Sequence, residues 1–312
     1  MKKILDCYRD FGVYYTFISI ITTFFRKLSS NSVIFHKLHH YKYKLIVKYL
    51  CNKNKELIDE YKQKENLNPN RKTKLIEDTK YIWICWWQGY GNAPELVKAC
   101  INKIKKNNNK KKVVIIDKYN YKDYTKISPI IIKKVRNKVF SITFFSDILR
   151  MNLLAKYGGI WIDATVVLNG DVLPNIDRYE VFTVKHGLYR SWHVSQGKWT
   201  SFFLGVGQNN LGIELIKDII TTYAIYENSL MGYLLLDAII TVAYDNVNSF
   251  RKQIDKIPIN NRKVFDMENM LDTIGNDFKV PSSINKLSYK RKYIKKINGL
   301  DTVYNLLIKN KL

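Results

Sequence analysis

A largely apolar stretch of the chain, FSDILRMNLLAKYGGIWIDATV (145–166), contains two acidic residues and an arginine. Asp147 and Arg150 are three positions apart, so in a helix their side chains project from one face. Asp163 follows a Gly-Gly pair and a short apolar run. Carboxylates and a guanidinium bind the hydroxyls and phosphates of polar ligands, and a carboxylate also binds cations. These three residues are therefore the first candidates for a functional site.

The helix that would position Asp147 and Arg150 is predicted to begin at Ser146 and to end at Tyr157. Serine is a favoured N-cap residue, and Gly158 supplies a C-terminal stop. A helix-capping acid with a local ion pair would use the same two charged residues. This structural role stays open beside the functional one.

A strand over residues 160–167 is predicted to carry Asp163 near its carboxyl end. With a period of two, Trp161, Asp163 and Thr165 share one face of that strand. Ligands of open α/β sheets bind in the crevice beyond the carboxyl ends of the strands. The alternative role for Asp163 is that of an acid in the turn that ends the strand.

The remaining pattern predicts an α/β fold with a mostly parallel sheet flanked by helices. A β-rich run at 80–87, a helix opened by Pro94 and a second apolar run at 112–117 alternate along the chain. Further strands are expected at 181–184 and 202–206, and further helices at 211–226 and 230–244.

The first part of the chain differs in character from the rest. The apolar run 13–25 is flanked by cations and is shorter than the roughly 20 residues that a membrane-spanning helix needs. It suits either a helix in the headgroup region or a core helix, and the basic, Tyr-rich stretch 36–55 favours membrane contact. Residues 56–78 are polar and are predicted to form a helix end and a linker. We therefore expect an N-terminal helical region over 1–78, with membrane association as the favoured of its two interpretations, and a second domain over 79–312.

The chain of 312 residues has a formal net charge of +25, which favours anionic partners such as nucleic acid, a bilayer surface or phosphorylated substrates. The basic residues are scattered, and no nucleic-acid-binding motif is present in the sequence. The four cysteines show no CxxC spacing, which favours reduced thiols in a cytosolic setting.

The stretch 145–166, together with IWICWWQGYGNAPELVKAC (82–100), closely resembles bacterial capsular polysaccharide synthesis glycosyltransferases. These are similar to enzymes with a DxD motif and a GT-A fold, including glycosyltransferase family 32 and the glucosylating toxins. The pattern SD-x-x-R followed by YGG-x-x-x-D carries the resemblance, which is strong over 81–171. It implies a GT-A-like domain over 79–312. It also implies a hexosyltransferase-type enzyme that moves a sugar, with retention of configuration, from a nucleotide sugar (a UDP-sugar is favoured) to a lipid-linked saccharide.

The resemblance also implies roles for individual residues. Asp163 matches the first Asp of the DxD motif, whose carboxylates approach Mn²⁺ or Mg²⁺, and Thr165 stands where the second Asp would be. The C-terminal INKLSYK (284–290) is expected either to close over the diphosphate or to form a solvated basic tail. The implied catalytic residues are Asp147, Arg150, Asp163 and Asp237, and the implied donor-binding residues are Trp83, Trp86, Trp87, Gln88, Asp147, Arg150, Gly158, Gly159 and Ser288.

Two other functions remain open at this stage. The missing second carboxylate is compatible with an inactive scaffold of a polysaccharide assembly complex, and the basic charge with a nucleic-acid-binding protein. For the enzyme, we expect a cytoplasmic protein that is peripheral at the inner face of the cell membrane and has no nucleic-acid partner. The loop 186–200 would line an acceptor groove or pack against the core.

Overall fold

The computed structural model describes residues 2–68, 71–108, 110–188 and 192–312. Its centre is a mixed sheet with the strand order β2-β1-β3-β6-β5. The bounds in that order are Lys112–Ile116, Tyr81–Cys85, Gly159–Ile162, Phe203–Val206 and Val181–Thr183. Strands β2, β1 and β3 are parallel, β6 is antiparallel to β3, and β5 is antiparallel to β6. All strands of this sheet except β6 therefore run in one direction, which confirms the predicted α/β class.

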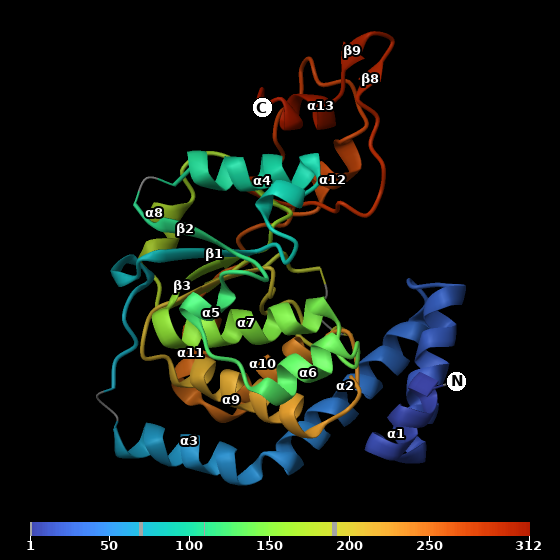
Figure 1. Ribbon diagram of the computed structural model, residues 1–312, viewed down its shortest axis with the longest axis vertical. Coiled ribbons are helices and arrows are strands. Elements are labelled where there is room, and N and C mark those ends of the chain that lie inside the picture. The colour runs from blue at the N-terminus through green and yellow to red at the C-terminus, as the bar shows by residue number, and fades with distance from the viewer. Residues whose placement is uncertain (1, 69–70, 109, 189–191) are drawn as a thin grey trace.

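Helices cover both faces of the sheet (Figure 1). The face that carries Trp83 and Trp161 packs on α7 (Ile142–Tyr157), with α9 (Leu211–Tyr226) and α10 (Leu235–Asn246) behind it. The opposite face carries Ile82 and Ile160 and packs on α4 (Glu95–Lys106). Because both faces are covered, β1 and β3 are apolar along their whole length, as is typical of parallel sheets.

The N-terminal helices α1 (Lys2–Leu28), α2 (Val33–Lys53) and α3 (Lys55–Leu67) lie on the far side of α9 and α10 from the sheet (Figure 1). The helix end predicted within residues 56–78 is α3, which ends at Leu67. The polar side chains of α3 face solvent, while Ile58 and Tyr61 are buried, and the Tyr61 hydroxyl donates to Asp218 over 2.6 Å. Among the described residues, no helix combines the length and the hydropathy that crossing a membrane would require.

The helix and the strand around the candidate residues differ from their predicted bounds. Helix α7 begins at Ile142, and its N-cap is Ser141 instead of Ser146. The predicted strand 160–167 is divided by a turn, because the backbone N–H of Val166 donates to the carbonyl of Asp163 over 2.9 Å. The segment after this turn is β4 (Val166–Leu168), which leaves the main sheet.

Strand β4 pairs in antiparallel fashion with β7 (Ile284–Lys286), which brings the C-terminal part of the chain to the sheet. Beyond α4, this part forms a small separate layer (Figure 1). Its elements are α12 (Asp266–Met270), β8 (Lys296–Ile297), β9 (Leu300–Asp301) and α13 (Val303–Ile308). The remaining helices are α5 (Tyr121–Tyr124), α6 (Pro129–Arg136), α8 (Leu173–Asp177) and α11 (Asn248–Asp255), with 3₁₀ turns at Ile76–Asp78 and Tyr90–Asn92.

Candidate functional site

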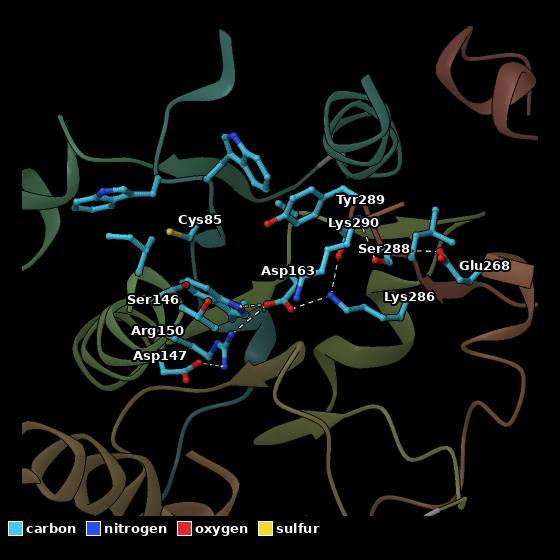
Figure 2. A pocket seen from close by; sticks show the side chains of 18 of the residues that line it. Cys85, Ser146, Asp147, Arg150, Asp163, Glu268, Lys286, Ser288, Tyr289 and Lys290 are labelled. Carbon is cyan, nitrogen blue, oxygen red and sulfur yellow. Dashed lines mark hydrogen bonds and ion pairs between the residues drawn. The ribbon is translucent and has the colours of Figure 1, made fainter. Parts of the chain in front are cut away.

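A cavity of about 630 Å³, called the first cavity below, lies at the carboxyl ends of β1 and β3. Its lining comes mainly from the residues after β1, the first half of α7, the turn after β3 and the end of β7 with the segment that follows it, and Tyr233 and residues in and beside α12 complete it. Figure 2 shows side chains from these segments converging on Asp163. The position matches the general rule for ligand sites in open α/β sheets.

Asp163 is the centre of the polar contacts in the first cavity. Its Oδ1 accepts from Arg150 Nη2 at 3.1 Å and from Trp161 Nε1 at 3.0 Å. Its Oδ2 accepts from the Lys286 ammonium at 2.9 Å (Figure 2). Burial acts to raise the pKa of Asp163, but the charges of Lys286 and Arg150 outweigh it and hold this pKa below its usual value. Asp163 is therefore ionised at neutral pH.

Arg150 links Asp163 to Asp147. Its guanidinium donates to Asp147 Oδ1 over 2.9 Å and stacks over the Trp161 ring at 4.8 Å, and the Arg150 side chain is only 6% exposed. Burial raises the pKa of Asp147 to about 6, although the neighbouring guanidinium opposes this shift. The sequence spacing thus predicted the Asp147–Arg150 pair, while the folded chain adds Asp163 as a second partner of the same cation.

Asp237 lies behind the first cavity and does not line it. It is buried in α10, where its Oδ1 accepts from Trp199 Nε1 over 3.1 Å. Burial, together with the nearby charge of Asp147, raises its pKa to about 7. Asp237 makes no contact in the first cavity that would support the catalytic role suggested by the sequence.

The residues Trp83, Gly158 and Gly159 also lie outside the cavity lining. Trp83 is fully buried, and its Nε1 donates to the Gly158 carbonyl over 2.9 Å. A Cβ on Gly159, whose φ is +105°, would come within 2.5 Å of the Tyr81 carbonyl oxygen. The glycine pair therefore allows the end of α7 to approach β1 closely, which is a structural role.

Trp86, Trp87 and Gln88 line the first cavity, as the sequence suggested for nucleotide-binding residues. The Trp87 ring packs on Phe145 at 5.1 Å, whereas the Trp86 ring contacts Tyr289 edge-on at 5.1 Å, at the side where the C-terminal segment passes. The Trp86 Nε1 is buried and has no hydrogen-bond partner within the described chain. Of the two rings, Trp86 is therefore the better placed to meet a ligand.

The C-terminal segment supplies Lys286, a partner of Asp163 that the sequence analysis did not name individually. Lys286 contacts Asp163, and its ammonium also donates to Thr165 Oγ1 over 2.7 Å. Lys286 lies within the segment INKLSYK (284–290), which the sequence resemblance placed near the diphosphate, but its contact with Asp163 was not predicted. Ser288, which the sequence did suggest, lines the cavity beside it.

The set of donors around Asp163 does not fit a divalent cation. Mg²⁺ prefers about six oxygen ligands in octahedral geometry, and sites usually combine carboxylates with water and phosphate oxygens. Within the described ranges there is no group of three or more His, Cys, Asp or Glu side chains arranged to hold a metal. Both carboxylate oxygens of Asp163 already accept from N–H donors, and a lysine ammonium lies between Asp163 and Thr165.

Comparison with known proteins identifies the class. The model of the family described as "Capsular polysaccharide synthesis protein" matches residues 27–307, so the chain belongs to this family, as its sequence resemblance indicated. Among solved structures, the PaToxG glycosyltransferase is similar, with a TM-score of 0.41 and 15% identity, over 69% of this chain and 86% of that chain. No match was found among curated proteins.

Proposed function

We propose that this protein is a glycosyltransferase with a GT-A-like domain that builds a capsular or other surface polysaccharide. The observation that carries the proposal is the first cavity, where Asp147, Arg150 and Asp163 converge at the carboxyl ends of parallel strands. Its volume of about 630 Å³ falls in the range of small-molecule sites. Membership of the capsular polysaccharide synthesis family supports the polysaccharide product.

In the proposed reaction, a nucleotide sugar, with UDP favoured, is the donor. The oxygen of an acceptor hydroxyl forms a bond to the anomeric carbon as the bond from that carbon to the diphosphate oxygen breaks. The electron pair leaves with the nucleoside diphosphate, and the hydroxyl proton passes to an oxygen of that diphosphate. We propose that this occurs with retention of configuration and that the transferred unit is a hexose.

The residues of the cavity fit separate parts of such a donor. We assign the nucleobase to the ring of Trp86, with Trp87 and Gln88 beside it, and the sugar hydroxyls to the carboxylates of Asp147 and Asp163. Carboxylates accept hydrogen bonds from paired hydroxyls, and the Arg150 guanidinium fixes both carboxylates in place. Ser288 lines the cavity on the C-terminal segment, and we assign the diphosphate to this side.

We further propose a lipid-linked acceptor and a peripheral location at the inner face of the cell membrane. Helix α1 exposes a series of large apolar side chains, among them Val13, Phe17, Ile20 and Phe24. Cations follow at its end, at Arg26 and Lys27. Apolar and basic side chains together are typical of helices that lie in an anionic membrane surface.

The test is release of nucleoside diphosphate from a panel of nucleotide sugars, by the full chain. We expect Asp163→Asn to lower the rate about 10²- to 10³-fold, the usual effect of removing a polar group that acts in the transition state. The matched control is Glu214→Gln, which breaks an ion pair with Arg71 away from the cavity and should leave the rate unchanged. Equal rates for Asp163→Asn and the wild type would refute the site.

The scaffold alternative makes the opposite prediction for binding. An inactive scaffold would show no UDP binding in a calorimetric titration, whereas the proposed enzyme binds UDP in the first cavity. Tight, salt-sensitive binding of oligonucleotides without UDP binding would instead support the nucleic-acid alternative.

A further inference from the structure

We propose that the ammonium of Lys286 takes the place of a divalent cation, so that sugar transfer needs no metal ion. This inference rests on the glycosyltransferase function proposed above. The ammonium lies 2.9 Å from Asp163 Oδ2 and 2.7 Å from Thr165 Oγ1. These are the two side chains that correspond to the DxD carboxylates, and the cation between them is a lysine (Figure 2).

The charges at this point are already balanced. Asp147 and Asp163 provide two negative charges, and Arg150 and Lys286 provide two positive charges, in one chain of contacts. A divalent cation would have to displace the ammonium from Asp163 Oδ2. Thr165 replaces a carboxylate by a neutral hydroxyl, which weakens the affinity for a hard cation and still accepts a hydrogen bond from an ammonium.

Lys286 is held in place by its backbone, unlike a lysine on a free surface. It is the last residue of β7, which pairs with β4, and its backbone N–H donates to the Val264 carbonyl over 2.7 Å. The backbone N–H of Leu287 donates to the Thr165 carbonyl over 2.9 Å. A backbone hydrogen bond thus joins two parts of the site. One is the turn with Asp163 and Thr165, and the other is the end of β7 with Lys286.

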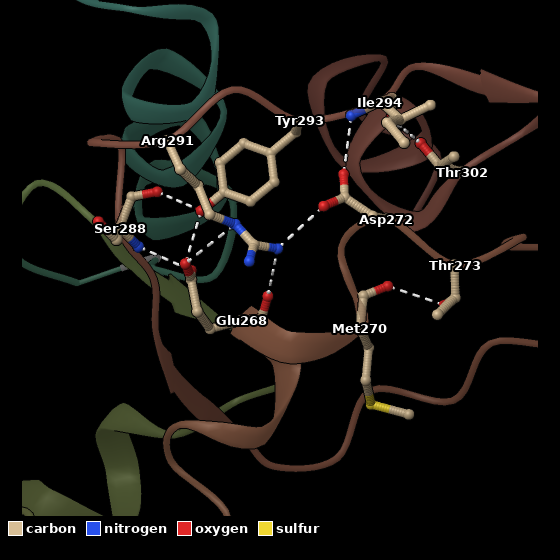
Figure 3. A network of polar contacts seen from close by, with 9 residues as sticks. All are labelled: Glu268, Met270, Asp272, Thr273, Ser288, Arg291, Tyr293, Ile294 and Thr302. Carbon is tan, nitrogen blue, oxygen red and sulfur yellow. Dashed lines mark hydrogen bonds and ion pairs between the residues drawn. The ribbon is translucent and has the colours of Figure 1, made fainter.

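A polar network anchors the segment that follows Lys286 (Figure 3). The Glu268 carboxylate accepts from the backbone N–H of Ser288 at 2.8 Å and from the Tyr293 hydroxyl at 2.6 Å. Asp272 accepts from Arg291 at 3.0 Å and from the backbone N–H of Ile294 at 2.7 Å. The network fixes the segment after Lys286, with Ser288 and Tyr289, along the wall of the first cavity.

The chemistry of the leaving group explains what a fixed ammonium would do. An ammonium has three N–H donors, and Asp163 and Thr165 use two of them in this structure. The third is left for an oxygen of the nucleoside diphosphate, which gains negative charge as the bond to the sugar breaks. A preorganised cation at that point stabilises the transition state, which is the function that a metal ion has in related chemistry.

The first experiment compares the wild type in excess EDTA with the wild type in Mn²⁺ or Mg²⁺. We expect UDP binding, measured by calorimetry, and turnover of the best nucleotide sugar to agree within about twofold between the buffers. Binding or turnover that appears only with the metal would overturn this inference and leave the glycosyltransferase function standing. Absence of UDP binding in every buffer would refute the proposed function itself.

The second experiment replaces the lysine. We expect Lys286→Met to lower turnover at least 100-fold and Lys286→Arg, which keeps the charge, to lower it less than tenfold. The control Lys292→Met removes an exposed cation from the same C-terminal segment that does not line the first cavity, and it should change turnover less than threefold. Full activity of Lys286→Met would overturn the inference, and the EDTA comparison decides the question if this variant does not fold.

A second inference comes from a different part of the molecule. A second cavity of about 380 Å³ lies between α1, α2 and the segments around residues 192–193 and 233–234. Its lining includes Arg26 and Lys42, and no Asp or Glu is among the described residues that line it. Neither cation forms an ion pair with any described residue. Tyr233 lines both cavities.

We infer that the second cavity binds the phosphate or diphosphate ester of the lipid-linked acceptor, which again rests on the proposed function. Arg and Lys are the usual partners of phosphate oxygens. The Lys42 ammonium donates one hydrogen bond within the described residues, to Ser19 Oγ over 2.9 Å, and lies over the Tyr15 ring at 5.9 Å, so it keeps donors for an anion. On α1, the exposed rings of Phe17 and Phe24 offer apolar surface to a lipid chain close to these cations.

This inference can be tested with farnesyl diphosphate, inorganic pyrophosphate and vesicles that contain phosphatidylglycerol. With the first cavity saturated by UDP, we expect the double variant Arg26→Gln/Lys42→Gln to bind farnesyl diphosphate at least tenfold more weakly than the wild type. The affinity for pyrophosphate should also be lower in this double variant than in the wild type. The control Lys27→Gln/Lys37→Gln removes exposed cations of the same helices outside the cavity and should leave this affinity unchanged.

The vesicles separate the two possible sources of phosphate. Both double variants should lose vesicle affinity to a similar extent, since each removes two positive charges. A specific loss of vesicle affinity in Arg26→Gln/Lys42→Gln, without a loss for farnesyl diphosphate, would make the cavity a headgroup site and overturn the inference. Unchanged binding of both probes would also overturn it.

Discussion

The two cavities that share Tyr233 differ in whether their cations have carboxylate partners. In the first cavity, Arg150 and Lys286 each contact a carboxylate, and Asp163 joins both of them. In the second cavity, Arg26 and Lys42 have no carboxylate partner within the described chain. The first arrangement is complete before a ligand arrives, whereas the second gains a counter-ion only when one binds. This difference predicts opposite effects when the charges are removed.

The largest effect is expected from Arg150→Met. This change leaves Asp147 and Asp163 without their shared cation, and breaking such a buried pair costs about 3–5 kcal/mol. Thermal and urea unfolding would measure the change in the free energy of unfolding. A variant as stable as the wild type would show that the first cavity does not depend on balanced charge.

The next effect is a stabilisation by Asp237→Asn, which tests the carboxyl group behind the first cavity. Burial and the charge of Asp147 raise the pKa of Asp237 from 3.8 to about 7 in the folded state. The folded protein therefore binds this proton more tightly, so Asp237 lowers stability as the pH rises from about 4 to about 7. The Asn variant keeps an acceptor for Trp199 and lacks the charge.

We expect this variant to gain about 2–4 kcal/mol at pH 8 and almost nothing near pH 4, since one pKa unit corresponds to about 1.4 kcal/mol. Urea unfolding across this pH range would measure the gain. An equal gain in stability at both pH values would contradict the raised pKa of Asp237. Loss of turnover in the Asn variant would instead support the catalytic role that the sequence suggested.

A smaller effect is expected from Lys42→Met. Burial lowers the pKa of Lys42 to about 8, so at neutral pH the charged ammonium reduces the stability of the folded state. Replacing Lys42 leaves no carboxylate without its partner. The Met variant should therefore have a free energy of unfolding equal to that of the wild type or up to about 2 kcal/mol higher at pH 7. Pyrophosphate should raise the melting temperature of the wild type more than that of Lys42→Met. A loss of stability comparable to that of Arg150→Met would remove the difference between the cavities.

The smallest effect is expected from Arg71→Met, on the surface. Arg71 and Glu214 form an ion pair of 2.6 Å whose side chains are 31% and 26% exposed. Such pairs contribute about 0–1 kcal/mol. The loss of unfolding free energy in Arg71→Met is the reference for the larger loss expected in Arg150→Met. High salt should make the loss in Arg71→Met smaller still.

The local patterns of the sequence predicted the class of the fold and much of the first cavity. The spacing of Asp147 and Arg150 and the position of Asp163 after a buried strand follow from helical and strand periods. The helix start was misplaced because Ser141 and Ser146 are both good N-cap residues, and the folded chain uses the earlier one. The turn at Asp163–Thr165 was missed because the apolar alternation continues through it into β4.

The contacts of Lys286 lie beyond such patterns. Asp163 and Lys286 are 123 positions apart, and their contact depends on the pairing of β4 with β7. The resemblance singled out the segment 284–290 that contains Lys286, but nothing in the sequence indicated which of its side chains would contact Asp163. The catalytic expectation for Asp237 and the donor-binding expectation for Trp83 came from resemblance, and burial places both residues away from the cavity.

The pairing of β4 with β7 also has a consequence for synthesis of the chain on the ribosome. Domains generally acquire structure as the chain emerges from its N-terminal end. Strand β4 would leave the ribosome long before β7, so the Asp163 carboxylate would meet Arg150 first and Lys286 more than a hundred residues later. In the nascent protein, the Asp163 carboxylate would thus have Arg150 as its only cation. The complete nucleotide site would form only after residue 286 has emerged.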